Sequence, residues 1–164
     1  MNDIAQRHDD LQQTALSLIL VDLPNQKARD AISRGLDEYN VERTNLPDEK
    51  ALDVLLIDDR TREAIGGLVG RTSLGVFFIN YFYLPAHHRG NGLGTKILAM
   101  AETEAARRGC FMVVLFTMVI QAPSFYEQFG YETFGRIDCN PPGNARIFMK
   151  KELTPSRGGA AGRD

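Results

Sequence analysis

A glycine-rich segment carries the clearest chemical signal in this sequence. Residues 89–95, Arg-Gly-Asn-Gly-Leu-Gly-Thr, join an extended apolar run to the strongest helical pattern in the chain. Backbone N–H groups at the start of a helix are free and lie at the positive end of the helix dipole, so they can bind an anion. Gly90, Gly92 and Gly94 lack the β-carbons that would keep a phosphate away from the main chain. The segment predicts a phosphate-binding loop in which Arg89 adds a positive charge, and the alternative is a simple turn.

Two common classes of phosphate-binding loop do not fit this segment. A P-loop ends in Gly-Lys-Ser/Thr, whereas Gly94-Thr95-Lys96 has a different order. The dinucleotide fingerprint is G-x-G-x-x-G with an acidic residue at the end of the next strand, but this loop is G-x-G-x-G and that strand ends in Phe116-Thr117. The sequence therefore disfavours hydrolysis of nucleoside triphosphates and a nicotinamide cofactor.

The second candidate segment is Phe125-Tyr126-Glu127-Gln128-Phe129-Gly130-Tyr131. Pro123 can open a short helix here, and Gly130 can end it. Phe125 and Phe129 are four residues apart and are interpreted as core residues, which leaves Tyr126 on a different face. From its spacing alone, Tyr126 is a packed aromatic residue whose hydroxyl meets a backbone carbonyl.

The hydrophobic pattern predicts the elements that position these segments. Strands are predicted over residues 15–23, 51–58, 64–71, 75–84, 111–116, 131–137 and 144–151. Helices are predicted over residues 25–42 with a break at Gly35, over residues 93–108, and from Pro123 to Gly130. Residues 111–116 are apolar at successive positions and follow a helix, which is typical of a central strand parallel to the strand before that helix. The expected fold is α/β, with a mixed and mostly antiparallel sheet flanked by helices.

Composition limits the class of protein. The chain has 164 residues, 43 % of them hydrophobic, and a net charge of −2, so it lacks the basic footprint of a nucleic-acid or anionic-membrane binder. We expect one domain over residues 14–153, a polar segment over residues 1–13, and a flexible tail over residues 154–164. Cys110 and Cys139 lack metal-ligand spacing and are interpreted as free thiols of a cytoplasmic protein without a metal.

The two candidate segments together resemble the GNAT family of N-acetyltransferases. Residues 89–94 match its R/Q-x-x-G-x-G/A signature, and residues 125–131 look like its FYEKLGF segment. The residues between them and the order of the predicted elements agree, so the resemblance covers residues 15–152. It implies the acyl-CoA N-acyltransferase fold, in which two parallel strands splay apart to admit the donor, acetyl-CoA.

The resemblance also implies roles for individual residues. The pyrophosphate of acetyl-CoA would lie on backbone amides of Arg89, Gly90, Asn91, Gly92, Leu93 and Gly94, with Thr95 opening the helix. The pantetheine arm would pair with main-chain groups of Tyr81, Tyr83 and Leu84, whose side chains are expected in the core. Tyr126 aligns with the tyrosine that protonates the departing thiolate. Two positions depart from the family pattern, because Val119 stands in place of a common Asn and Phe116 in place of a common acid.

The implied activity is transfer of an acetyl group to a primary amine by direct attack, without a covalent enzyme intermediate. A small-molecule amine is the expected acceptor. The alternatives are a lysine or N-terminal amine of a protein, or a module that binds acetyl-CoA without turnover. Many members of the family are homodimers, which makes a homodimer a candidate assembly.

Overall fold

The computed structural model of the chain describes residues 16–154. The polar segment expected at residues 1–13 and all of the expected tail except Thr154 lie outside the described residues. The described residues divide between Leu36 and Asp37 into two compact units.

Helix α1 (Gln26–Thr44) spans this division and is continuous through Gly35, where a break was predicted. A glycine inside a helix costs about 1 kcal/mol relative to alanine, which is too little to interrupt a helix of this length. The Asn25 side chain accepts a hydrogen bond from the Ala28 N–H at 3.0 Å and so caps the helix start. Asn45 ends the helix with a φ of 56°, and no residue of α1 is buried.

The strand predicted over residues 15–23 is wrong for residues 16–23, which form no strand. Apolar side chains in this run, Leu18 and Leu20 among them, are fully exposed. A strand requires a partner for its backbone N–H and C=O groups, and none of the described strands pairs with this run.

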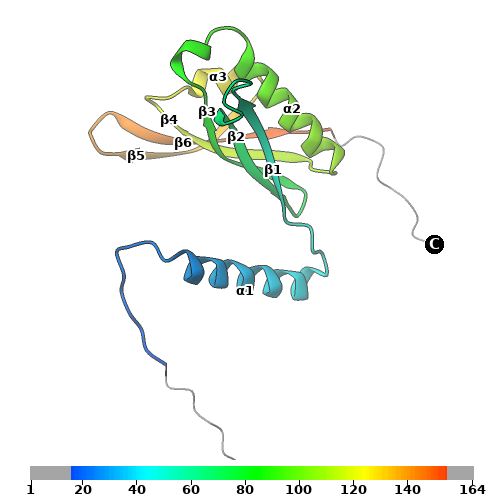
Figure 1. Ribbon diagram of the computed structural model, residues 1–164, viewed down its shortest axis with the longest axis vertical. Helices are drawn as coiled ribbons and strands as arrows, with labels where there is room; N and C mark the ends of the chain where they lie inside the picture. The colour runs from blue at the N-terminus through cyan, green and yellow to red at the C-terminus, as the bar shows by residue number, and fades with distance from the viewer. Residues whose placement is uncertain (1–15, 155–164) are drawn as a thin grey trace, which may run out of the picture. The chain divides into compact units, whose positions relative to one another are not determined.

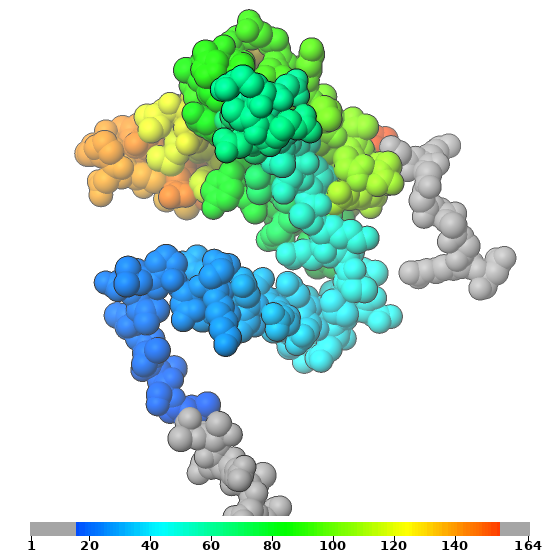
Figure 2. Space-filling view, in the orientation of Figure 1, coloured from blue at the N-terminus to red at the C-terminus, as the bar shows by residue number. Residues whose placement is uncertain are grey.

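Six strands form one sheet in the order β1-β2-β3-β4-β6-β5 (Figure 1). Their bounds are β1 (Lys50–Ile57), β2 (Ala64–Ser73), β3 (Val76–Tyr83), β4 (Met112–Met118), β5 (Glu132–Cys139) and β6 (Asn144–Glu152). The β3–β4 pair is parallel and the other four pairs are antiparallel, which confirms the mixed, mostly antiparallel sheet. Strand β5 lies at one edge of the sheet, and its side chains are largely exposed (Figure 2).

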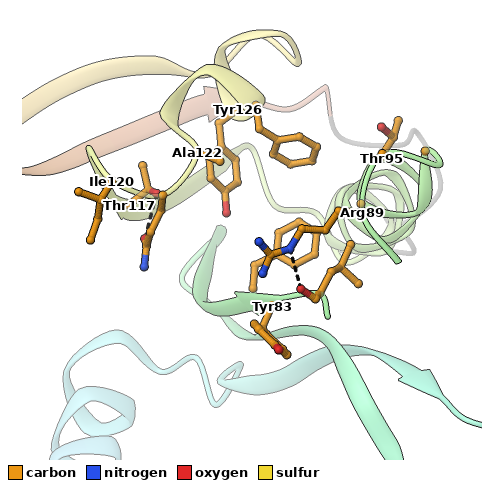
Figure 3. A pocket seen from close by; sticks show the side chains of 14 residues that line it. Tyr83, Arg89, Thr95, Thr117, Ile120, Ala122 and Tyr126 are labelled. Carbon is orange, nitrogen blue, oxygen red and sulfur yellow. Dashed lines mark hydrogen bonds between the residues drawn. The ribbon is translucent and has the colours of Figure 1, made fainter. Parts of the chain in front are cut away.

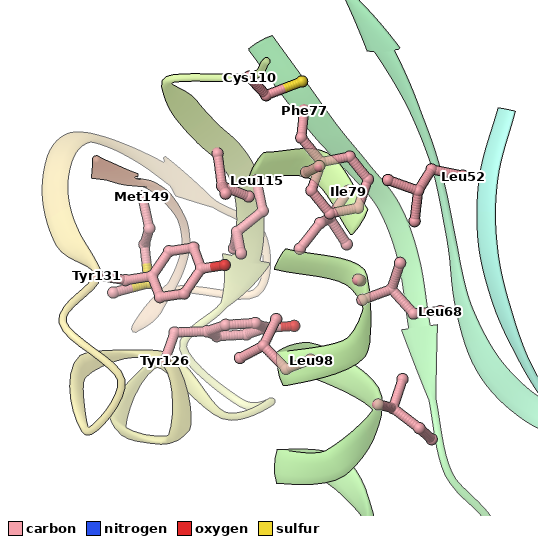
Figure 4. Close-up of a cluster of buried hydrophobic side chains, with 14 of the residues drawn as sticks. Leu52, Leu68, Phe77, Ile79, Leu98, Cys110, Leu115, Tyr126, Tyr131 and Met149 are labelled. Carbon is pink, nitrogen blue, oxygen red and sulfur yellow. The ribbon is translucent and has the colours of Figure 1, made fainter. Parts of the chain in front are cut away.

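Helices α2 (Leu93–Arg107) and α3 (Pro123–Glu127) pack on one face of this sheet (Figure 4). The predicted apolar face of α2 is confirmed, because Ile97, Leu98, Ala101 and Ala105 are all buried. The two alanines bring the α2 backbone close to the sheet. From the strands, Leu68 and Phe77 are among the fully buried side chains that fill the same core.

The parallel β3–β4 pair is short, and its end creates the space for a site. Pairing runs from Val76 opposite Met112 to Ile79 opposite Leu115 and stops there, although both strands continue. A register shift opposite Val69 and Gly70 of β2 leaves Asn80 of β3 without a pairing partner, as in a β-bulge. Beyond Ile79, the β4-facing edge of β3 therefore has backbone groups free for a ligand.

The C-terminus of α2 is joined to the sheet by a charged side chain. Arg108 donates from Nη1 to the Ala51 carbonyl at 2.8 Å and from Nε to Oε1 of Glu104 at 2.8 Å. Arg107 donates to both oxygens of the same carboxylate, at 2.6 and 2.8 Å. Hydrogen bonds from Arg107 and Arg108 lower the pKa of Glu104 from 4.5 to about 2.

This depressed pKa predicts a specific loss of stability in acid. The folded state binds the Glu104 proton less tightly than the unfolded state does. The stabilisation of the folded state by ionised Glu104 is therefore present above pH 4.5 and is lost as the pH falls towards about 2. We expect Glu104→Gln to have a lower melting temperature than the wild type at pH 7. The difference should shrink across this pH range in thermal unfolding scans, and a difference independent of pH would contradict the assignment.

Candidate functional site

A pocket of about 580 Å³ lies at the carboxyl ends of β3 and β4 (Figure 3). Eight of the ten residues predicted for the site line it: Tyr83, Leu84, Arg89, Gly90, Gly92, Gly94, Thr95 and Tyr126. Asn91 is exposed outside the pocket lining, and Leu93 packs its side chain against the core. The structure thus brings the glycine loop and the α3 tyrosine, about thirty residues apart, to one cavity.

Two glycines of the loop adopt backbone conformations that L side chains rarely take. Gly90 has a φ of 81° and Gly92 a φ of 74°, both in the left-handed region. A β-carbon built at either position would meet nothing within 4 Å. The backbone at these two residues therefore borders open space, as a close approach of a ligand to the main chain requires.

The N-terminus of α2 presents unpaired donors to this space. The first helical hydrogen bond runs from the Lys96 N–H to the Gly92 carbonyl at 3.1 Å. Among the described residues, the N–H groups of Leu93, Gly94 and Thr95 have no hydrogen-bond partner, and no side chain caps the helix. The first turn contains no acidic residue. This helix start can therefore accept an anion without competition from a carboxylate.

Arg89 is the one charged side chain in the lining of the pocket. Its Nε donates to the Leu84 carbonyl at 2.8 Å, and its guanidinium carbon lies 6.0 Å from the centre of the Tyr83 ring. These contacts fix the planar guanidinium and leave its two terminal nitrogens available to a ligand. The pocket is therefore electropositive at the loop.

The tyrosines of β3 do not pack in the core as expected. Tyr81 is 74 % exposed and Tyr83 is 58 % exposed. The inward positions of this strand are taken by Phe77 and Ile79, and the Asn80 bulge changes the alternation that follows them. Arg89 engages the Leu84 carbonyl, and the backbone groups on the β4-facing edge of β3 beyond Ile79 remain free for a ligand.

Tyr126 lies with its ring in the core and its hydroxyl directed into the pocket (Figure 3). The residue is 8 % exposed and therefore more buried than Phe125 and Phe129, which were predicted to be its buried neighbours. The Phe125 ring packs edge-to-face on Tyr126 with centroids 5.2 Å apart. No described residue hydrogen-bonds to the Tyr126 hydroxyl. Burial raises the pKa of Tyr126 to about 12, so the hydroxyl is protonated at neutral pH.

Sequence reasoning missed the turn after β4, which closes the pocket opposite the glycine loop. Gln121 accepts a hydrogen bond at Oε1 from the Thr117 hydroxyl at 3.2 Å (Figure 3). The same oxygen accepts a second bond from the Met118 N–H at 3.0 Å. Thr117, Ile120 and Gln121 line the pocket. The signal that could have identified them is their place at the carboxyl end of a parallel strand, where ligand sites in open sheets lie.

The two positions that depart from the family pattern do not line the pocket. Phe116 points away from the core and packs against β6, with the Arg146 guanidinium carbon 4.9 Å from its ring centre. Val119 contributes its N–H to the Ala145 carbonyl at 3.0 Å. Both residues therefore stabilise the β4–β6 side of the sheet.

Among residues 16–154, no group of three or more His, Cys, Asp or Glu side chains is placed to hold a metal ion. No helix within this range is long and apolar enough to cross a membrane.

Known proteins resemble this chain in sequence and in structure. A family model described as an acetyltransferase (GNAT) domain matches residues 52–133. An acetyltransferase of Agrobacterium fabrum is 32 % identical over 138 residues, which cover 84 % of this chain and all of that protein. The blasticidin-S acetyltransferase of Streptomyces morookaense is 36 % identical over 92 residues, 56 % of this chain and 68 % of that protein. The crystal structure of an acetyltransferase from Agrobacterium tumefaciens is 31 % identical, superposes with a TM-score of 0.76, and covers 84 % of this chain and all of that one.

Proposed function

Because this chain belongs to the GNAT family of acetyltransferases, we propose that it transfers the acetyl group of acetyl-CoA to a primary amine of a small molecule. The chain is an acetyltransferase by family, and the proposal concerns its acceptor and its chemistry. The observation that carries the proposal is one pocket that holds an anion-binding loop at one end and a protonated tyrosine hydroxyl at the other.

The glycine loop fits the pyrophosphate of acetyl-CoA. The free N–H groups of Leu93, Gly94 and Thr95 supply donors at the positive end of α2, and Arg89 supplies a charge. Gly90 and Gly92 leave room for the phosphates beside the main chain. The arm that carries the acetyl group would run along the unpaired end of β3, past Tyr83 and Leu84.

Tyr126 is positioned to act at the other end of this arm. When the amine nitrogen attacks the carbonyl carbon, a C–N bond forms and the C–S bond breaks, with the electron pair leaving on sulfur. A thiolate in a pocket with little water gains stability from a nearby donor, and the Tyr126 hydroxyl can give its proton to the sulfur. The attacking amine loses a proton in the same reaction, and we assign no residue to that step.

One relative favours a small molecule over a protein as the acceptor. The Streptomyces relative is named for its action on blasticidin S, an individual compound. For the present chain we propose the same class of acceptor, which is a small antibiotic-like amine. The same proposal includes a cytoplasmic location, a homodimer and a single domain over residues 14–153.

A thiol-release assay over a panel of amines tests the acceptor. The panel contains blasticidin S, an aminoglycoside, a polyamine, an amino acid and a lysine peptide, each with acetyl-CoA. We expect release of CoA with at least one small amine and a lower kcat/KM for the peptide. A preference for the peptide would assign the chain to protein acetylation. Stabilisation by acetyl-CoA without turnover of any amine would identify the chain as a module that binds acetyl-CoA without catalysis.

A further inference from the structure

A partly buried polar network behind Tyr126 links α2, β6 and Tyr131, the residue that precedes β5. The Tyr131 hydroxyl donates a hydrogen bond to Oε1 of Glu102 on α2 at 2.9 Å. Nζ of Lys151 on β6 donates one to Oε2 of the same carboxylate at 2.6 Å. Tyr131 is 3 % exposed, and the side chains of Glu102 and Lys151 are 15 % and 23 % exposed. We refer to Glu102, Tyr131 and Lys151 as the Glu102 network.

The Glu102 network lies outside the lining of the pocket, so it does not contact the reacting groups directly. Removing a carboxylate and an ammonium from water costs several kcal/mol for each ion, and apolar side chains of the same volume often give equal or greater stability. Apolar packing lacks direction, whereas hydrogen bonds to a carboxylate fix distances and angles. The presence of this network is therefore better explained by the positions that its hydrogen bonds fix than by a gain in stability.

Through Tyr131, the network fixes the position of Tyr126. The rings of Tyr131 and Tyr126 pack edge-to-face with centroids 5.5 Å apart and planes at 69° (Figure 4). The Tyr131 N–H also donates to the Tyr126 carbonyl at 3.2 Å, beside a second bond from the Phe129 N–H at 2.9 Å. Tyr131 thus contacts both the ring and the backbone of Tyr126 while its own hydroxyl is held by Glu102.

Helix α3, which carries Tyr126, needs such support from outside. It has five residues and no side-chain cap at its N-terminus. A helix of one turn is not stable by itself, so its position is set by tertiary contacts. Burial and the neighbouring Glu102 carboxylate raise the pKa of Tyr131, which keeps its hydroxyl protonated and able to donate.

We propose that Tyr131 is a positioning residue, anchored by Glu102 and Lys151, that holds the Tyr126 hydroxyl where the thiolate leaves. This inference rests on the proposed acetyl transfer. A displacement of a catalytic group by about 1 Å can lower a rate by up to about 10²-fold, so a hydroxyl on a mobile turn would be a poor donor.

Tyr131→Phe is the informative variant because it removes one hydroxyl and keeps the ring and the Glu102–Lys151 pair. We expect kcat to fall by about tenfold with the KM for acetyl-CoA unchanged. In a Tyr126→Phe background the same change should have no further effect, because no hydroxyl remains to be positioned. A loss by the same factor in both backgrounds, or no loss in either, would overturn the proposal.

A second measurement does not depend on activity. In protein with ring-labelled tyrosine, we expect the NMR signals of the Tyr126 ring to shift or broaden in Tyr131→Phe. Tyr39→Phe, which removes an exposed hydroxyl from α1, is the matched control and should alter neither those signals nor kcat. Unaltered Tyr126 signals in Tyr131→Phe would overturn the proposal. If the wild type acetylates no amine, the proposed function fails, and the NMR measurement still decides whether Tyr131 positions Tyr126.

Discussion

Replacement of Gly92 with valine is expected to abolish the stabilisation of this protein by acetyl-CoA. A ligand that binds the folded state alone stabilises it by about 2.7 kcal/mol at a concentration of 100 Kd. For a domain of this size, that corresponds to a rise in melting temperature of roughly 5–10 °C. The valine side chain would fill the space beside the main chain where the phosphates are proposed to lie, and the rise should vanish.

The valine also strains the backbone, so the experiment needs a control with the same strain. Gly92 has a φ of 74°, and a non-glycine residue in this region costs about 1–3 kcal/mol. Gly109 has a φ of 86° and equally open surroundings, and it lies at the other end of α2. Gly109→Val should lower the melting temperature of the free protein in the same way and keep the full rise with acetyl-CoA. An equal rise in both variants would show that the loop does not hold the donor.

The sequence predicted the parts of the site that depend on local pattern. The α2 helix, its buried face and the parallel strand that follows it come from short-range periodicity, and the glycine loop comes from residue type at fixed spacing. Predicted and observed strand bounds differ by at most two residues from residue 50 onwards, as at β1, predicted over residues 51–58 and observed at Lys50–Ile57. Element ends are the positions at which local pattern says least.

The parts that were missed depend on contacts between distant residues. Glu102 meets Tyr131 across 29 positions and Lys151 across 49, so no short-range pattern could identify this network. The exposure of Tyr83 follows from a bulge in the pairing of β2 with β3, which alternation alone does not predict. The run at residues 16–23 has the composition of a strand, but composition does not supply a partner strand.

Tyr126→Phe is expected to lower kcat while leaving the affinity for acetyl-CoA unchanged. The substitution keeps the ring, which packs against Phe125 and Tyr131, and removes the hydroxyl directed into the pocket. General acid catalysis is worth about 10² to 10⁴ in rate, and a donor is most effective when its pKa lies near the working pH. Because the pKa of Tyr126 is about 12, we expect a loss near the low end, roughly 10²-fold. A thermal shift with acetyl-CoA equal to that of the wild type would establish that the donor site is intact.

The same pKa fixes the pH dependence of the wild type. Burial raises the pKa of Tyr126 from 10.0 to about 12, so the folded protein keeps this proton at a pH where an exposed tyrosine would lose it. Between pH 7 and pH 10 kcat/KM should rise as the acceptor amine, with a pKa of about 10.4 for a lysine-like group, becomes neutral. It should not fall through loss of the tyrosine proton in this range. A falling limb with an apparent pKa near 9 that persists in Tyr126→Phe would assign the proton donor to another group.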